Sequence, residues 1–305
     1  MKSVSARRKG GFIHETGFDM VFDIVIILIA VLLSLLVLYP LIYVVSASFS
    51  NPLSITRGEV WLLPKQITLN AYQSIITNQD LLSGFKNTVV IAVLGTLINL
   101  VMTTCCAYPL SRKEMFGHNT ITVFITFTMF FSAGMIPNYL LIRDLNLLDN
   151  TLALILPGSI SVYNMLIMRN YFQNSIPEDL FGAAKIDGCN NIQTLVKVVL
   201  PLSKSIIAVM VIFYAVGHWN AYFDSLLYMS SKDKFPLQLV LRRLLLESQA
   251  LQDDTGIGQH MAESSLAFVS IQYAVIVVSS LPVLILYPLL QKYFVQGVMI
   301  GAVKG

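Results

Sequence analysis

The segment GHWNAYFDSLLYM at 217–229 carries the residues best suited to bind a polar ligand within an apolar stretch. Asp224 is the clearest acidic residue in such a stretch, and a charge placed in lipid is costly enough to be a functional candidate. Trp219 and Tyr222 can stack on flat apolar faces of such a ligand, while Asn220 and Asp224 can bond its hydroxyls. The alternative is that Asp224 lies near a membrane surface and stays hydrated.

Other sets of residues that do chemistry are weak or missing. Tyr163 and Asn164 are weaker candidates for contacting the same ligand, since polar residues also hold membrane helices together. The sequence has no GxxxxGK[ST] phosphate loop, no HExxH and no GxSxG. Its four histidines are scattered, and its three cysteines form no CxxC pair. We therefore predict that the chain is not an enzyme, holds no metal or cofactor, and takes energy for any transport from a partner or an ion gradient.

Composition predicts a membrane protein. Of the 305 residues, 55% are hydrophobic and only 12% are charged, whereas soluble domains carry about 25% charged residues. The net charge of +3 is small, and no basic cluster is interleaved with aromatic residues. Nucleic acid is therefore excluded as a partner, and membrane lipid is expected to surround much of the chain.

Six apolar segments are long enough to cross a membrane, because a crossing helix needs about 20 mostly apolar residues. Backbone groups cannot stay unpaired in lipid, so these segments must be helical. We predict an all-α polytopic membrane domain at 20–295, with six spans at about 20–48, 85–110, 119–142, 150–172, 202–229 and 266–295. Pro157 and Gly158 interrupt the fourth span.

Lys and Arg residues predict that both termini are cytoplasmic. The N-terminal segment 1–19 places a basic cluster beside the first span, and an even number of spans returns the tail at 296–305 to the same side. The loop at 175–201 is then cytoplasmic, and the loop at 230–265 faces outward. The first half of this outer loop has helical apolar spacing, whereas its second half, DDTGIGQH, is expected to be irregular.

Residues 175–201 predict a short helix, a turn and a second helix. Ser175 and Glu178 fit a capping box at the start of the first helix. Gly188 is suited to the left-handed conformation that ends it. Asn190 or Asn191 can cap the second helix. The small residues at the centre of the first helix would let it dock in a cleft of another protein, or the loop could lie on the membrane surface.

The spacing in this loop resembles the cytoplasmic coupling loop of ATP-binding-cassette type I importer permeases of the carbohydrate-uptake, maltose-type family. The matching positions are Ala183, Ala184, Asp187, Gly188, Leu200 and Pro201, with Val198 as the aliphatic residue between. One position departs from the pattern, because Gly182 stands where the family has Glu. In that family the loop forms a short coupling helix between spans four and five that sits in a groove of the ATPase subunit.

Two further stretches are similar to the same family. The segment GHWNAYFDSLLYM resembles the Trp-Asn-x-aromatic-Phe region of carbohydrate permeases, and the tail QKYFVQGVMIGAVKG resembles that of the smaller permease subunit. The resemblance covers nearly the whole chain and is closest to the branch that imports complex oligosaccharides. It implies a multi-pass protein of the bacterial cytoplasmic membrane that forms half of a translocation path by alternating access.

The resemblance also implies partners. These are a second permease subunit, giving a heterodimer, two ATPase subunits that bind ATP and Mg, and an extracytoplasmic sugar-binding protein. The tail would reach between the ATPase subunits through Gly301, Val303, Lys304 and Gly305. The last outward loop would approach the binding protein through Asp253, Asp254, Gly256 and Gly258.

Two other functions compete with this interpretation. A self-sufficient secondary transporter of a polar solute would need buried acids or bases to couple an ion gradient, and only Asp224 fits such a role. A membrane scaffold would use the 183–188 segment for assembly without transport. The resemblance favours the ATP-driven importer over both.

Overall fold

The computed structural model describes residues 17–131, 133–253 and 259–302, and this part of the chain contains helices and no β-strand. Apolar runs account for the long helices, which pair every backbone group internally as lipid requires. The longer helices are α1 (Gly17–Ser48), α4 (Gln79–Ser111), α5 (His118–Phe130), α6 (Met135–Asp144), α7 (Val162–Ser175), α11 (Lys204–Asn220), α13 (Leu237–Asp253) and α14 (Gln259–Ala302). The short ones are α2 (Pro52–Thr56), α3 (Asn70–Thr77), η1 (Thr151–Leu154), α8 (Glu178–Ile186), α9 (Asn191–Thr194), η2 (Leu195–Val199), α10 (Leu200–Leu202), α12 (Phe223–Tyr228) and η3 (Lys232–Lys234).

Three helical segments of the described chain are long and apolar enough to cross a membrane: Val21–Ser48, Gln79–Ser111 and Phe268–Pro288. They correspond to the first, second and sixth predicted spans. Two bent helix pairs meet the same test only when each pair is taken together, which gives up to five spans. The fold is therefore consistent with that of a polytopic membrane protein.

The third, fourth and fifth predicted spans are not single helices. Segment 119–142 forms α5 and α6, whose axes lie at 109° to each other. Segment 150–172 forms η1 and the 14-residue α7, with Pro157 and Gly158 in the non-helical stretch between them. Segment 202–229 is interrupted after Asn220, because Ala221 is extended. The break at Pro157 and Gly158 confirms the interruption predicted for the fourth span, whereas apolar composition predicts neither of the other two breaks.

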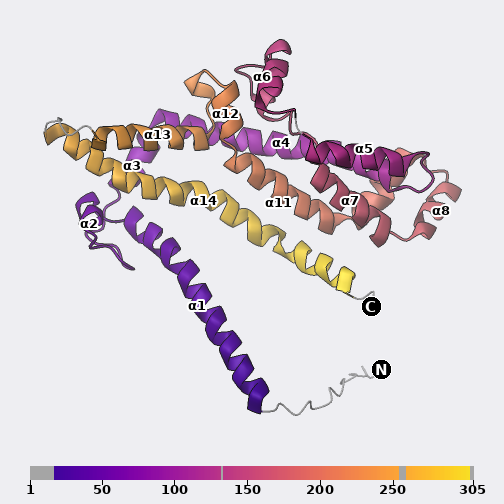
Figure 1. The fold of residues 1–305 in the computed structure, drawn as a ribbon, viewed down its shortest axis with the longest axis horizontal. Helices are drawn as coiled ribbons and strands as arrows, with labels where there is room; N and C mark the ends of the chain where they lie inside the picture. The colour runs from indigo at the N-terminus through magenta and orange to yellow at the C-terminus, as the bar shows by residue number, and fades with distance from the viewer. Residues whose placement is uncertain (1–16, 132, 254–258, 303–305) are drawn as a thin grey trace.

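The helices α4, α11 and α14 lie along one another, and α7 packs on α4 (Figure 1). Helix α1 diverges from this bundle, and in the part of the chain that the structure describes it packs on α14 near its own C-terminal end, where the rings of Tyr43 and Tyr273 lie 5.8 Å apart, edge to face. None of the 18 residues in its most apolar window is buried. An apolar helix so exposed within the chain must be covered by lipid or by another protein.

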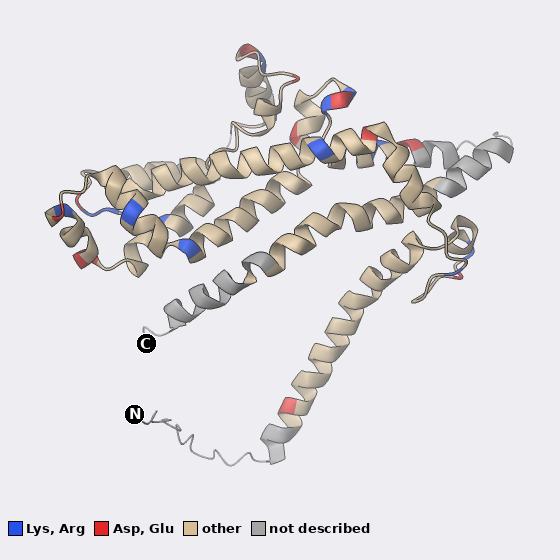
Figure 2. Ribbon diagram, turned by 180° about the vertical axis from the view of Figure 1, so that it is seen from behind, with Lys and Arg blue, Asp and Glu red and all other residues tan. Residues whose placement is uncertain are grey.

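The two largest clusters of buried side chains form most of the core of the described chain. One joins α4, α11, α13 and α14 around Trp219, Leu237 and Leu239. The other joins α4, α7, α8 and α11 around Met165, Phe172, Phe181 and Tyr214. Figure 2 shows that most charged residues lie at the ends of the long helices and in the segments between them, so that the middle parts of these helices are largely uncharged.

Polar residues of α4 form hydrogen bonds to the helices that pack against it. Thr88 Oγ1 accepts a 2.7 Å hydrogen bond from the backbone N–H of Leu237, and the hydroxyls of Thr103 and Tyr214 lie 2.6 Å apart. Gly95 allows α11 to approach, since a Cβ there would lie 2.5 Å from Nε2 of His218. Small residues and hydrogen bonds of this kind hold membrane helices together where the hydrophobic effect cannot.

Candidate functional site

The helix α8 begins differently from the sequence prediction. Ser175 is the last residue of α7 and caps nothing, and the N-cap of α8 is Pro177, which has no side-chain capping bond. The predicted capping box of Ser175 and Glu178 is therefore wrong. The capping box does not form because Glu178 points toward Lys113, just after the end of α4, and the two side chains form an ion pair of 3.4 Å.

The end of α8 matches the prediction closely. Gly188 has φ of +75°, the left-handed conformation predicted for it. The N–H of Cys189 donates to the carbonyl of Ala184 at 2.9 Å, and the N–H of Gly188 donates to that of Lys185 at 3.2 Å. These two bonds are those of a Schellman motif, which satisfies the last carbonyls of a helix. Glycine is favoured here because a Cβ destabilises this conformation.

The second helix of the loop starts at a capping box made by Asn190 and Gln193. Asn190 Oδ1 accepts from the N–H of Gln193 at 2.8 Å, and the N–H of Asn190 donates to Oε1 of Gln193 at 3.0 Å. The chain then passes through the π-helical η2 into α10, which contains Leu200 and Pro201. It turns by 85° into α11. Pro201 lies in the first turn of α10, where it lacks the N–H that would bond to the preceding turn.

One face of α8 is buried and the opposite face is open. Phe181 and Ala184 are both buried, and Phe181 belongs to the core cluster that also contains residues of α7 and α11. Gly182 and Ala183 are exposed, and Ile186 is 88% exposed. Of the predicted Ala183-Ala184 pair, only Ala183 can therefore touch a partner, while Ala184 anchors the helix.

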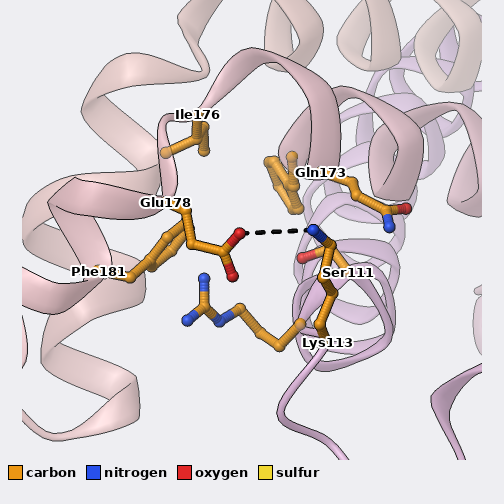
Figure 3. Close-up of a pocket in the computed structure, with 8 residues that line it drawn as sticks. Ser111, Lys113, Gln173, Ile176, Glu178 and Phe181 are labelled. Carbon is orange, nitrogen blue, oxygen red and sulfur yellow. Dashed lines mark hydrogen bonds and ion pairs between the residues drawn. The ribbon is translucent and has the colours of Figure 1, made fainter.

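The anchored face of α8 is joined to the end of α4 around a small pocket (Figure 3). The guanidinium carbon of Arg112 lies 3.5 Å from the centre of the Phe181 ring, and its side chain is only 17% exposed. The Lys113–Glu178 pair closes the same pocket from outside. That pair is worth less than about 1 kcal/mol because both groups are largely exposed. The Arg112–Phe181 contact, partly desolvated, is the stronger connection.

Sequence reasoning missed Arg112, Lys113, Phe181 and Ile186. Arg112 and Phe181 are 69 positions apart, so no local pattern could pair them. Ile186 had a usable signal, because it is an apolar residue in a short polar helix that has its own buried face.

The predicted substrate-path residues separate into two groups. Trp219 is buried, its indole N–H donates to the carbonyl of Ser279 at 2.9 Å, and its ring packs edge to face on Phe85. In this conformation it holds α11 against α14 and α4. Asn220, Tyr222 and Asp224 are exposed where α11 ends and α12 begins. Tyr163 and Asn164 lie on α7, beside the other core cluster, so the six residues do not line one surface.

Several predicted contact residues lie outside the described residues. These are Asp254, Gly256, Gly258, Val303, Lys304 and Gly305. Asp253 is the last residue of α13, and the backbone of Gly301 belongs to α14. The first half of the predicted outer loop is helical as its apolar spacing indicated, and Leu237 and Val240 are buried in the core.

Comparisons with known proteins agree with this architecture. A family model for the binding-protein-dependent transport system inner membrane component matches residues 10–300. Protein LplC of Bacillus subtilis (strain 168) is 38% identical over 96% of this chain and 98% of its own. The polygalacturonan/rhamnogalacturonan transport system permease protein YtcP of the same organism is 39% identical over 87% of this chain and 92% of its own.

A solved structure is also similar. It is the crystal structure of a bacterial ABC transporter involved in the import of the acidic polysaccharide alginate, and it matches with a TM-score of 0.82 and 34% sequence identity. The match covers 92% of this chain and 98% of the other. These findings favour a permease subunit over a self-sufficient secondary transporter, and they place the chain in the bacterial cell membrane. This chain belongs to the family of inner membrane components of binding-protein-dependent ABC transport systems.

Proposed function

We propose that this chain is one permease half of an ATP-driven oligosaccharide importer and that α8 couples it to an ATPase subunit. The observation that carries the proposal is the division of α8 into an anchored face and an open apolar face. Phe181 and Arg112 fix the helix to α4, while Ala183 and the 88%-exposed Ile186 remain uncovered. A helix held on one side and apolar on the other can transmit movement of a partner to α4.

The topology belongs to the same proposal. The chain crosses the membrane six times, with both termini and α8 on the cytoplasmic side. The two bent helix pairs serve as spans, and the fourth crossing combines η1 and α7. The even number of crossings agrees with Figure 1, in which α1 and α14 run in opposite directions. The exposed surface of α1 is covered by a second permease subunit, so that the working unit is a heterodimer.

The remaining partners complete an ABC importer. Two ATPase subunits bind ATP and Mg, and the tail at Gly301, Val303, Lys304 and Gly305 reaches between them. An extracytoplasmic sugar-binding protein delivers the substrate near Asp253, Asp254, Gly256 and Gly258. Oligosaccharides are proposed as substrates because YtcP is named as a permease for polygalacturonan and rhamnogalacturonan. Asn220, Tyr222 and Asp224 are the exposed residues of the proposed sugar path.

ATP-driven uptake tests this function. The complete importer, reconstituted in proteoliposomes, should transport labelled oligosaccharide only under two conditions. ATP must be present on the side of the ATPase subunits, and the binding protein must be present on the opposite side. Ile186→Asp should reduce uptake more than tenfold, because it places a charge in an apolar contact. Ile186→Leu is the matched control and should retain uptake. Uptake driven by an ion gradient without ATPase subunits, or normal uptake in Ile186→Asp, would refute the proposal.

A further inference from the structure

Two neighbouring arginines of α13 have different surroundings. The guanidinium of Arg243 lies 5.7 Å from the ring centre of Phe235 and forms an ion pair of 3.4 Å with Glu247. The guanidinium of Arg242 lies 4.9 Å from the ring centre of Tyr222. Among the side chains that the structure describes, no carboxylate pairs with Arg242. Arg242 is thus a half-buried cation with an aromatic contact and no described counter-ion.

The contact with Tyr222 leaves the guanidinium able to bind an anion. Stacking uses the flat face of the group, whereas its N–H donors point outward from its edge. Two of these donors match the two oxygens of a carboxylate, and such paired bonds are among the strong hydrogen bonds of proteins. Because the ring restrains the long side chain, less conformational entropy is lost when the anion binds.

Aromatic surface is available beside this cation. Tyr222 is 41% exposed and Phe223 is 49% exposed, and their rings are perpendicular with centres 6.4 Å apart. They lie at the break between α11 and α12, where the chain leaves the apolar bundle. Exposed aromatic rings of this kind can pack against the C–H face of a pyranose. The carboxylate of Asp224, exposed in the same short helix, can accept hydrogen bonds from sugar hydroxyls.

We infer that Arg242, Tyr222 and Phe223 form a binding site for the carboxylate-bearing residue of an acidic oligosaccharide, a uronic acid. The inference rests on the proposed function, and it names the substrate class of the same path. A neutral sugar would use the rings and Asp224 and leave the guanidinium of Arg242 without a partner. An acidic sugar uses all of these groups, with its carboxylate on Arg242 and its hydroxyls toward Asp224.

The test compares one charged and one uncharged sugar in the complete importer. Trigalacturonate and its fully methyl-esterified form have the same ring skeleton, but only the first carries carboxylates. Arg242→Gln should raise the half-saturating concentration of trigalacturonate by about 10- to 100-fold, the usual range for losing hydrogen bonds between charged groups. It should leave uptake of the ester unchanged. Arg243→Gln, the matched control, should change neither, because Arg243 already has Glu247.

Three results would overturn the inference. Equal loss of both sugars in Arg242→Gln would assign Arg242 to structure or to docking of the binding protein. If Arg242→Gln changed the binding-protein concentration needed for half-maximal uptake of both sugars, Arg242 would likewise be assigned to docking of the binding protein. A wild-type importer that takes up neutral oligosaccharides with ATP, but neither galacturonide, would also exclude the site. In that last case the proposed function would stand, whereas the absence of ATP-driven uptake of any saccharide would refute the function itself.

Discussion

Two arginines contact aromatic rings, one just after α4 beside α8 and the other on α13, and they differ in what remains free. At the α8 end, Arg112 lies 3.5 Å from the ring centre of Phe181, is largely buried, and has Glu114 at 3.8 Å. At the α13 end, Arg242 lies 4.9 Å from the ring centre of Tyr222, with no described carboxylate. The first contact is closed and joins two helices, so it suits transmission of force. The second leaves hydrogen-bond donors available, so it suits a ligand.

From this difference we expect the residues beside α8 to act in coupling and those on α13 to act in substrate recognition. Changes at the α8 end should affect stability and coupling for every substrate. Changes at the α13 end should affect some substrates and leave coupling intact. The variants below are arranged from the largest expected effect to the smallest.

Phe181→Ala tests whether the α8 end is a structural joint. Phe181 is 9% exposed and packs in the cluster with Phe172 and Ile176, so its truncation leaves a cavity and removes the platform of Arg112. Removal of a buried Phe costs about 3 kcal/mol or more. We expect a lower melting temperature of the solubilised importer and a loss of ATP-driven uptake of every sugar.

The matched control is Phe116→Ala, because Phe116 lies near the same end but is 99% exposed. It should leave the melting temperature unchanged, since no buried surface is lost. If the two variants melt alike, the packing of Phe181 does not hold α8 to α4. If Phe181→Ala impairs only acidic sugars, the distinction between the two ends fails.

Gly188→Val tests the turn that orients α8. A Cβ at Gly188 would meet no atom within 4 Å, so the expected effect comes from its φ of +75° alone. Left-handed backbone costs an ordinary L-residue about 1–2 kcal/mol, and a β-branched residue tolerates it less well. We expect the Schellman motif to open and uptake to fall, while the ATPase subunits still hydrolyse ATP. Parallel assays of uptake and phosphate release measure this uncoupling.

Gly182→Ala provides the control for that turn. Gly182 is within α8, has an ordinary helical conformation, and has open space where a Cβ would stand. Alanine should stabilise the helix by up to about 1 kcal/mol. Uptake should persist, because Ala183 beside it already presents a methyl group. Equal uncoupling in both glycine variants would show that the surface of α8, and not its left-handed end, is what matters.

These residues also show what the sequence could predict. The glycine turn and the asparagine cap were predictable, because each depends on contacts within a few residues. The spans at α1, α4 and α14 and the apolar face of α13 followed from composition and spacing. The family resemblance then marked residues 175–201 as a unit, although it could not assign Ala184 to the buried side.

The failures concern contacts between distant parts of the chain. Glu178 was predicted to cap its own helix, but it meets Lys113, which lies in the turn just after α4. Trp219 was predicted to face a sugar, but its N–H is taken by the carbonyl of Ser279. In both cases the local pattern allowed two partners, and only the packing of helices selected one. The same limit hid Arg242, whose aromatic partner is 20 positions away.

Asp149→Asn tests whether Lys234, a cation just before α13, already has a carboxylate partner, in contrast to Arg242. The carboxylate of Asp149 accepts from Lys234 at 2.8 Å, from the Ser231 hydroxyl at 2.6 Å and from two backbone N–H groups. The Lys234 and Ser231 bonds hold the pKa of Asp149 well below its ordinary value of 3.8. We expect a modestly lower melting temperature at neutral pH, smaller than for Phe181→Ala, because the ion pair is exposed to water.

The pH dependence of that variant follows from the direction of the shift. A carboxyl group whose pKa is lowered by folding stabilises the fold above its ordinary pKa, and this contribution is lost as pH falls through the folded value. The difference in melting temperature between wild type and Asp149→Asn should thus be constant from pH 5 to 8 and shrink only below about pH 4. Asp144→Asn is the control, since Asp144 pairs only with its neighbour Arg143 and is exposed. A difference that already varies near pH 6 would mean that another group titrates with the Asp149 contacts, and Lys234 would no longer count as a satisfied cation beside the open Arg242.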